Sequence, residues 1–237
     1  VTSVIAARFP VSLQFGVISL ILTYLICIPL GVLKAVKDGS RLDVSSSFIL
    51  MVLYSIPPLI LGIVLRMFLA GGAYLDLFPL SDLVSDNYAD LTFWGQILDR
   101  IHHFILPLIC YMVGSFTVLT FLMKNSLLDE VKLDYVRTAR AKGLEEKYVI
   151  YKHALRNALI PIVTGLSSFL MVFFAGSIII EQIFNLDGMG LLGYKAALDR
   201  DYNVLMGLIF FQAVLALVGR LISDLLYLVI DPRIDFT

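Results

Sequence analysis

The sequence predicts an all-α, polytopic membrane protein. Of its 237 residues 59% are hydrophobic and only 16% are charged, and the mean hydropathy is +0.90, whereas soluble domains are about 45–50% apolar and about 25% charged. Apolar runs recur along the chain at about the 20 residues that a helix needs to cross a bilayer. These runs lack the alternation of barrel strands, so spanning helices are expected.

Five stretches are long enough to be spans, at residues 11–33, 44–65, 104–123, 157–180 and 202–230. Residues 1–10 precede the first span. They are predicted to form an amphipathic helix that ends at Pro10, or a frayed lead-in at the membrane surface.

Basic residues in the loops set the predicted orientation, because cytoplasmic loops carry an excess of Lys and Arg. Eleven lie in the loops after the first and third spans, against three in the other two loops, so the first pair of loops is predicted to be cytoplasmic. Five spans then place Val1 outside, and we expect at least one further span before it in the natural protein. The eleven are Lys34, Lys37, Arg41, Lys124, Lys132, Arg137, Arg140, Lys142, Lys147, Lys152 and Arg156; the three are Arg100, Lys195 and Arg200.

The second span contains Pro57 and Pro58 side by side. Neither proline has an N–H, so two helical hydrogen bonds are lost and a kink or break is expected. Broken helices survive at membrane depth where protein or a wet cavity satisfies the freed carbonyls. The motif predicts either a stretch that lines a translocation pathway, with Tyr54 and Ser55 as candidate substrate contacts, or a purely structural kink.

The two external loops are acidic, and the second is rich in glycine. Their acids could attract a cationic ligand or a basic protein surface, or they could form a solvated acidic face. The segment NLDGMGLLG predicts a turn-rich re-entrant or gating loop, so Glu181, Gly188 and Gly190 are candidates for an external gate. The acids are Asp76, Asp82, Asp86, Asp90 and Asp99 in the first loop, and Glu181, Asp187, Asp199 and Asp201 in the second.

The loop at residues 124–156 has a pattern of its own. DYVRTARAK favours a helix, and Gly143 follows where a left-handed C-terminal cap would lie. Apolar residues at helical spacing then predict a second, amphipathic helix. This pattern fits equally a knob that docks into a groove on another protein and a helix that lies on anionic lipid headgroups. The apolar face is predicted to be Leu144, Tyr148, Tyr151, Leu155 and Leu159, and the other face Lys147, Lys152 and Arg156.

The same loop resembles the EAA loop of bacterial ABC-importer permeases, a pattern of Glu-Ala-Ala, three residues, Gly, and later Ile-x-Leu-Pro. Ala139, Gly143 and Leu155 match this pattern, whereas Arg137, Thr138, His153 and Arg156 depart from it. The variant TARAKGL…HALRNALIP is typical of the dipeptide, oligopeptide and nickel permease family. Other segments, among them YSIPPLILGIVL and DLLYLVIDPRID, resemble its B-type subunit, and AGGAYLDLFPL, KNSLLDEV and DPRIDF are most similar to the Yej-type branch.

This resemblance implies that residues 1–237 are the N-terminally truncated transmembrane domain of a peptide importer of the bacterial inner membrane, with five of six spans. It implies a second homologous permease subunit, two ABC ATPase subunits, an external substrate-binding protein, a peptide substrate and membrane lipid as partners, and no nucleic acid. The ATPase-coupling residues would be Arg137, Ala139, Arg140, Ala141, Lys142, Gly143, Leu144, Tyr148 and His153.

The chain is not expected to be an enzyme, because the resemblance assigns ATP hydrolysis to separate subunits. We expect no cofactor and no catalytic or metal-binding residues, and the sequence has no GxxxxGK[ST], HExxH or GxSxG motif. A secondary transporter and a membrane scaffold are the competing classes. The first would predict inverted repeats and midplane acids, and the sequence shows neither clearly.

Overall fold

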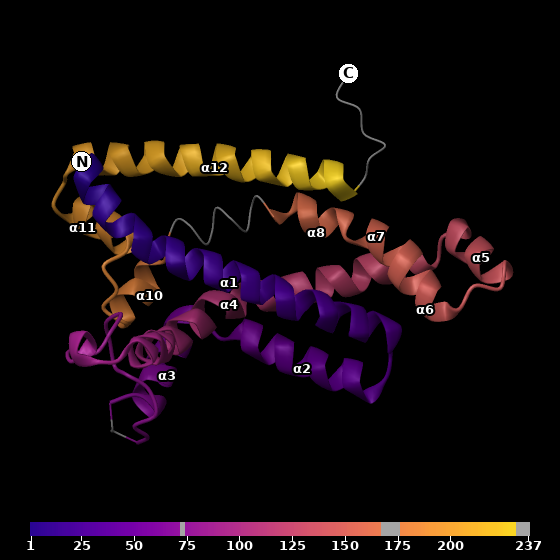
Figure 1. Ribbon diagram of the computed structural model, residues 1–237, viewed down its shortest axis with the longest axis horizontal. Helices are drawn as coiled ribbons and strands as arrows, with labels where there is room; N and C mark the ends of the chain where they lie inside the picture. Colours follow the sequence, from indigo (N-terminus) through magenta and orange to yellow (C-terminus); the bar gives the residue numbers. More distant parts are fainter. Residues whose placement is uncertain (72–73, 167–175, 231–237) are drawn as a thin grey trace. The chain divides into compact units, whose positions relative to one another are not determined.

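The computed structural model describes residues 1–71, 74–166 and 176–230 (Figure 1). The regular structure of these residues is helical, apart from one isolated bridge between Ala70 and Phe78. The predicted all-α class is therefore confirmed. The α-helices are α1 (Thr2–Val36), α2 (Arg41–Ser55), α3 (Pro58–Leu69), α4 (Phe93–Val131), α5 (Asp134–Ala141), α6 (Glu146–Tyr148), α7 (Leu155–Ala158), α8 (Ile160–Thr164), α10 (Ile178–Ile183), α11 (Met189–Leu198) and α12 (Tyr202–Ile230); η1 (Tyr88–Asp90) is a 3-10 turn and η2 (Val149–Ala154) a π-helical turn.

Three of the described helices, α1, α4 and α12, are long and apolar enough to cross a membrane. The α2–α3 pair passes the same test together, as a span bent at a short break. These four elements contain the first, second, third and fifth predicted spans. The fourth, at residues 157–180, falls partly outside the described residues.

Helix α1 continues through Pro10, so the prediction that a separate helix ends there is wrong. A proline removes only its own N–H bond, and contacts on both sides can hold the helix. Before it, the Phe9 ring packs edge-on against Phe211 with 4.8 Å between ring centroids. After it, Ser12 is buried and hydrogen-bonded to Glu181.

The chain forms two compact units, each built from three stretches. Unit 1 comprises Val1–Ile21, Tyr54–Gly114 and Met171–Leu215, and unit 2 comprises Leu22–Leu53, Ser115–Leu170 and Ala216–Thr237. In unit 1, Phe15 stacks on Phe104 and Tyr111 of α4, with centroid distances of 4.4 and 5.8 Å.

The core of unit 2 contains side chains of the 124–156 loop. Val136 and Ala139 of α5 and Val149 of η2 are buried in one cluster with Met123 of α4 and Cys27 of α1. Because these residues share a core, the loop is an integral part of the unit and not a solvated linker.

Candidate functional site

Helix α5 of the 124–156 loop ends in the predicted glycine cap. Gly143 has φ +80°, and the N–H of Leu144 reaches back to the carbonyl of Ala139 at 3.4 Å. This is the bond of a Schellman cap, in which the left-handed residue is usually glycine. A Cβ built on Gly143 would meet no atom of the described residues within 4 Å. The cap predicted at Gly143 is confirmed.

An ion pair closes the turn around Gly143. The guanidinium of Arg140 donates to both carboxylate oxygens of Glu146, at 3.0 and 2.7 Å. This hydrogen bonding lowers the pKa of Glu146 and raises the pKa of Arg140. Because the pair is solvent-exposed it adds little stability, and its bidentate geometry mainly fixes the shape of the turn.

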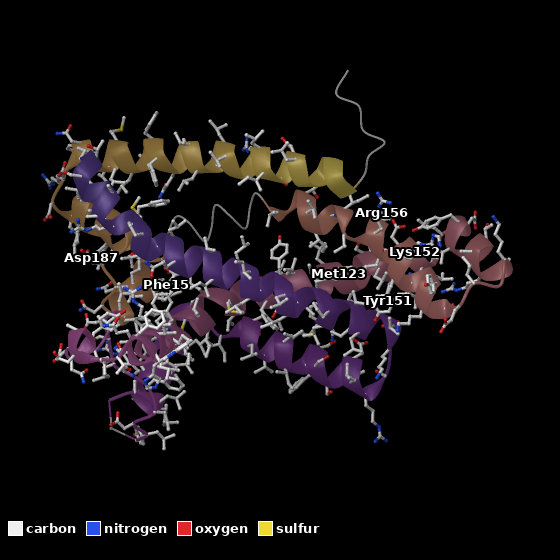
Figure 2. The ribbon with its side chains drawn as sticks, viewed as in Figure 1. Phe15, Met123, Tyr151, Lys152, Arg156 and Asp187 are labelled. Atoms are coloured by element: carbon white, nitrogen blue, oxygen red, sulfur yellow. The ribbon has the colours of Figure 1, made fainter. Side chains whose placement is uncertain are left out.

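The predicted apolar face of the second loop helix is wrong in its first half. Tyr148 and Tyr151 are 57% and 53% exposed and Leu144 is exposed as well, whereas Val149 and Ala154 are buried. The π-helical turn η2 lies between the two halves, and its wider turn puts Tyr148 out of phase with Leu155 and Leu159. Leu144 lies before α6 and is not part of a helix. The result is a patch of exposed Leu144, Tyr148 and Tyr151, which we call the loop patch (Tyr151 and the neighbouring Lys152 are labelled in Figure 2).

The predicted coupling residues divide between surface and core. Ala139 lies on the buried face of α5, so its side chain is not available to a partner protein. It can only help to hold the helix in place. His153 is half-buried. The remaining seven are exposed: Arg137, Arg140, Ala141, Lys142, Gly143, Leu144 and Tyr148.

Sequence reasoning missed a link at the base of the loop. The Tyr135 hydroxyl on α5 donates to Glu130 at the end of α4 and accepts from the Asn157 side chain on α7 at 3.1 Å. Burial and the bond to Glu130 raise the pKa of Tyr135 to about 12. Its partners lie 5 and 22 residues away, and no periodic pattern marks such a contact.

Two lysines that were predicted to lie in cytoplasmic loops instead lie in α1 and α4 and belong to a charge cluster in unit 2. Lys34 is fully buried and lies 3.1 Å from Asp43, while Lys124 bridges Asp43 at 2.7 Å and Asp38 at 2.8 Å. Buried charged groups need such partners, because burial of an unpaired charge costs folding free energy. The cluster therefore braces the unit-2 parts of α1, α2 and α4.

The predicted break in the second span is confirmed. Helix α2 ends at Ser55, α3 begins at Pro58, and Pro57 between them has an extended backbone with φ −57° and ψ 139°. Tyr54, Ser55 and both prolines are exposed in this chain. Their side chains are therefore open to a substrate, a second subunit or lipid.

Glu181 of α10 is enclosed in unit 1 with only 1% of its surface exposed. Its carboxylate accepts from the Leu191 N–H at 2.7 Å, the Ser12 hydroxyl at 3.1 Å, the Ser177 N–H at 3.3 Å and the Tyr111 hydroxyl at 3.4 Å. These donors come from α1, α4, the turn before α10, and α11. The carboxylate also caps the N-terminus of α11, where a negative charge is stabilised.

Two glycines make room for this carboxylate, and a third allows α11 to pack closely on the turn before α10. A Cβ would lie 2.4 Å from Oε1 of Glu181 if added to Gly176, and 2.5 Å from its Cδ if added to Gly188. On Gly190 it would meet the Ile178 nitrogen at 2.7 Å. The structure thus brings together the three predicted gate residues. It also removes Glu181 from the predicted acidic surface, because the side chain is buried. We call Glu181, its four donors and these glycines the glutamate cage.

Two hydrogen bonds and an ion pair link residues next to the cage to other segments of unit 1. Arg66 donates to the carbonyl of Ile183 at 2.6 Å, and Asn185 donates to Asp82 at 2.6 Å. Arg8 pairs with Asp187 at 3.0 Å. Among the described residues no group of three or more His, Cys, Asp or Glu side chains is arranged to hold a metal ion.

Comparison with known proteins places these features in context. The family model for binding-protein-dependent transport system inner membrane components matches residues 27–236. The peptidoglycan transport system permease protein YejB of Agrobacterium fabrum is 47% identical over all of this chain and 65% of its own length. The inner membrane ABC transporter permease protein YejB of Escherichia coli O157:H7 is 45% identical over the same shares. The chain thus spans about 65% of the length of these two relatives.

Two further comparisons agree. The oligopeptide transport system permease protein AppB of Bacillus subtilis is 39% identical over 100% of this chain and 72% of its own length. Among solved structures, an inward-facing MetNI methionine ABC transporter superposes with a TM-score of 0.71 over 97% of both chains, at 17% identity. At that identity the likeness shows the fold.

Proposed function

We propose, from the premise that this chain belongs to the family of binding-protein-dependent transport system inner membrane components, that it is the transmembrane permease subunit of an ATP-driven ABC importer for peptides. Membership of this family confirms the predicted inner-membrane location. The observation that carries the proposal is similarity over the whole chain to proteins named as peptidoglycan and oligopeptide permeases.

In this proposal the chain forms half of the translocation pathway, beside a second homologous permease subunit. Two ABC ATPase subunits bind on the cytoplasmic side, and an external binding protein delivers the peptide. The relatives are named as permease proteins, and we assign ATP hydrolysis to the separate ATPase subunits. This chain then needs no cofactor of its own.

The 124–156 loop is the proposed docking site for an ATPase subunit. Its inner side is fixed in the core of unit 2, and its outer side presents the loop patch of Leu144, Tyr148 and Tyr151. Exposed apolar and aromatic side chains of this kind mark interaction sites. Because Val136 and Ala139 pack on α1 and α4 side chains, a displacement of α5 would be transmitted to those helices.

Pro57 and Pro58, with Tyr54 and Ser55, are proposed to line the pathway. An interrupted helix leaves carbonyls unsatisfied, and these need a wet or protein environment at membrane depth. The exposed position of all four residues on this chain supports that role.

Replacing both Pro57 and Pro58 with Ala is expected to lower peptide uptake strongly and leave assembly with the ATPase subunits intact. Each proline costs a helix interior about 3 kcal/mol, so the change favours a continuous α2–α3 helix. Uptake by proteoliposomes and co-purification measure the two effects. Pro10→Ala is the matched control, because α1 already runs through an exposed Pro10. Unchanged uptake in the double variant would show that the prolines serve the folding of the chain and not transport.

The glutamate cage is proposed to hold the external gate closed. Glu181, Gly188 and Gly190 pack so closely that residues 176–191 have little freedom while the carboxylate keeps its four donors. Opening the gate would then require these hydrogen bonds to be exchanged for others.

Purification of a tagged chain from its native membranes tests the proposed function. An ABC permease should bring down ATPase subunits, and peptide together with the binding protein should stimulate ATP hydrolysis in that complex. A secondary transporter would move substrate without any ATPase subunit. A scaffold would bind partners but move nothing.

A further inference from the structure

Apolar side chains are exposed on the first turns of α4. Trp94 and Leu98 are 71% and 66% exposed, and Phe93 and Ile101 are exposed as well. Trp94, Leu98 and Ile101 are spaced four and three residues apart, so they lie along one face of the helix. We call these four side chains the outer stripe.

Three polar side chains of the same turns, Gln96, Asp99 and His103, bond to neighbouring parts of the chain. Arg100 and His102 are exposed, but the Arg100 guanidinium lies over the Tyr88 ring and a ring nitrogen of His102 is hydrogen-bonded to the carbonyl of Leu77. Asp99 accepts from the backbone N–H of Ser85 at 3.0 Å and from its hydroxyl, and His103 is buried beside Asp99. Gln96 donates to the carbonyls of Tyr88 and Leu91, each at 3.3 Å. A helix on a water-exposed surface has the opposite arrangement, with its apolar face inward. The exposed apolar side chains of these turns therefore favour an apolar environment on the outer side.

The outer stripe continues into the apolar run of α4. Ile105 follows Ile101 after four residues and Ile109 follows after another four, and Ile109 is again exposed. A groove of about 500 Å³ lies along this face. Its lining is mainly apolar, with two polar side chains: Leu91, Gly95, Leu98, Asp99, Ile101, His102 and Ile105. The stripe is thus continuous with the surface of a helix that is long and apolar enough to cross the membrane.

We propose that the outer stripe is a membrane-interface anchor, bound to phospholipids of the outer leaflet. The Trp94 ring lies at the level of the headgroups, and Leu98 and Ile101 contact the upper part of the acyl chains. Tryptophan prefers this boundary because its ring is apolar and its N–H is polar. The outer leaflet follows from the loop charges, which place the start of α4 on the external side. The anchor is independent of which solute the protein transports.

Trp94 is the only tryptophan of the chain, so its fluorescence reports on this site alone. The experiment uses the 237-residue chain in phospholipid nanodiscs, with nitroxide lipids labelled either near the acyl carbonyl or near the terminal methyl. We expect blue-shifted emission, loss of most intensity with the carbonyl-proximal nitroxide, little loss with the terminal one, and protection from aqueous iodide. The control Trp94→Phe/Tyr148→Trp moves the indole to the loop patch, where iodide should quench it and lipid nitroxides should not.

Three results would overturn the proposal. Efficient iodide quenching of Trp94 without lipid quenching would show that the stripe faces water. If a binding protein or a second permease subunit then restored protection, the stripe would be a protein-docking surface. Stronger quenching by the terminal nitroxide would place Trp94 in the bilayer interior and remove it from the interface.

Discussion

Gly143→Val is expected to abolish peptide uptake and to weaken retention of the ATPase subunits, with the protein still present in the membrane at its normal level. Gly143 has φ +80°, a conformation that costs a β-branched residue about 1–2 kcal/mol. A Cβ there meets nothing in the described part of the chain, so the branched side chain projects from the loop where the ATPase subunit would dock. Uptake into proteoliposomes and co-purification of ATPase subunits are the measurements.

Gly39→Val is the matched control for this substitution. Gly39 has φ +71° and also has nothing within 4 Å of a built Cβ, but it lies outside the 124–156 loop. The Gly39→Val variant should lose a similar amount of stability through backbone strain, and it should retain its ATPase subunits. Equal losses in both variants would point to strain alone. Normal uptake and ATPase retention by Gly143→Val would show that the loop is a lipid-facing linker.

Gly190→Ala is expected to destabilise the packing of α10 and α11 in the glutamate cage and to reduce uptake severely. The new methyl group would lie 2.7 Å from the nitrogen of Ile178 and 2.9 Å from the carbonyl carbon of Ser177. Both are backbone atoms, so the methyl can be accommodated only if α10 and α11 move apart. Overpacking of this kind costs about 1–3 kcal/mol or more, and it would also pull Glu181 from the Leu191 N–H. Thermal unfolding of the purified chain measures the loss of stability.

Gly193→Ala in the same helix is expected to raise, and not to lower, the thermal stability of the chain. Its Cβ would meet only Leu208 Cδ1, at an ordinary 3.5 Å. Alanine also favours a helix over glycine by about 1 kcal/mol. Equal thermal stability of the two variants would contradict the close packing of the glutamate cage. Normal uptake by a destabilised Gly190→Ala protein would show that the glutamate cage has no role in transport.

Features that depend on neighbouring residues could be predicted from the sequence. The break at Pro57 and Pro58 follows from two missing N–H groups, and the cap at Gly143 from the tolerance of glycine for positive φ. The three single-helix spans and the bent α2–α3 pair in the described residues follow from run length and composition. The candidate gate residues were proposed from the glycine-rich segment NLDGMGLLG, but the sequence did not indicate that Glu181 is buried.

Features that depend on distant partners could not be predicted. Ser12 lies 169 residues from Glu181, and Lys124 lies 81 residues from Asp43. Nothing in the local pattern indicates that these side chains meet. The loop patch was assigned to the wrong face for a different reason. A constant helical period of 3.6 was assumed, whereas the π-helical turn η2 puts the side chains before it out of phase with those after it, and Leu144 lies outside the helix.

A site-specific cross-link from the loop patch tests the central claim most directly, namely that the 124–156 loop binds the ATPase subunit. Tyr148→Cys places an exposed thiol on the patch, and the background is low because Cys27 and Cys110 are both buried. With a short cross-linker in native membranes that carries a thiol-reactive group at one end and a photoactivated group at the other, we predict an adduct between this chain and an ATPase subunit. An importer that assembles and transports, yet gives no such adduct, would contradict docking through this loop.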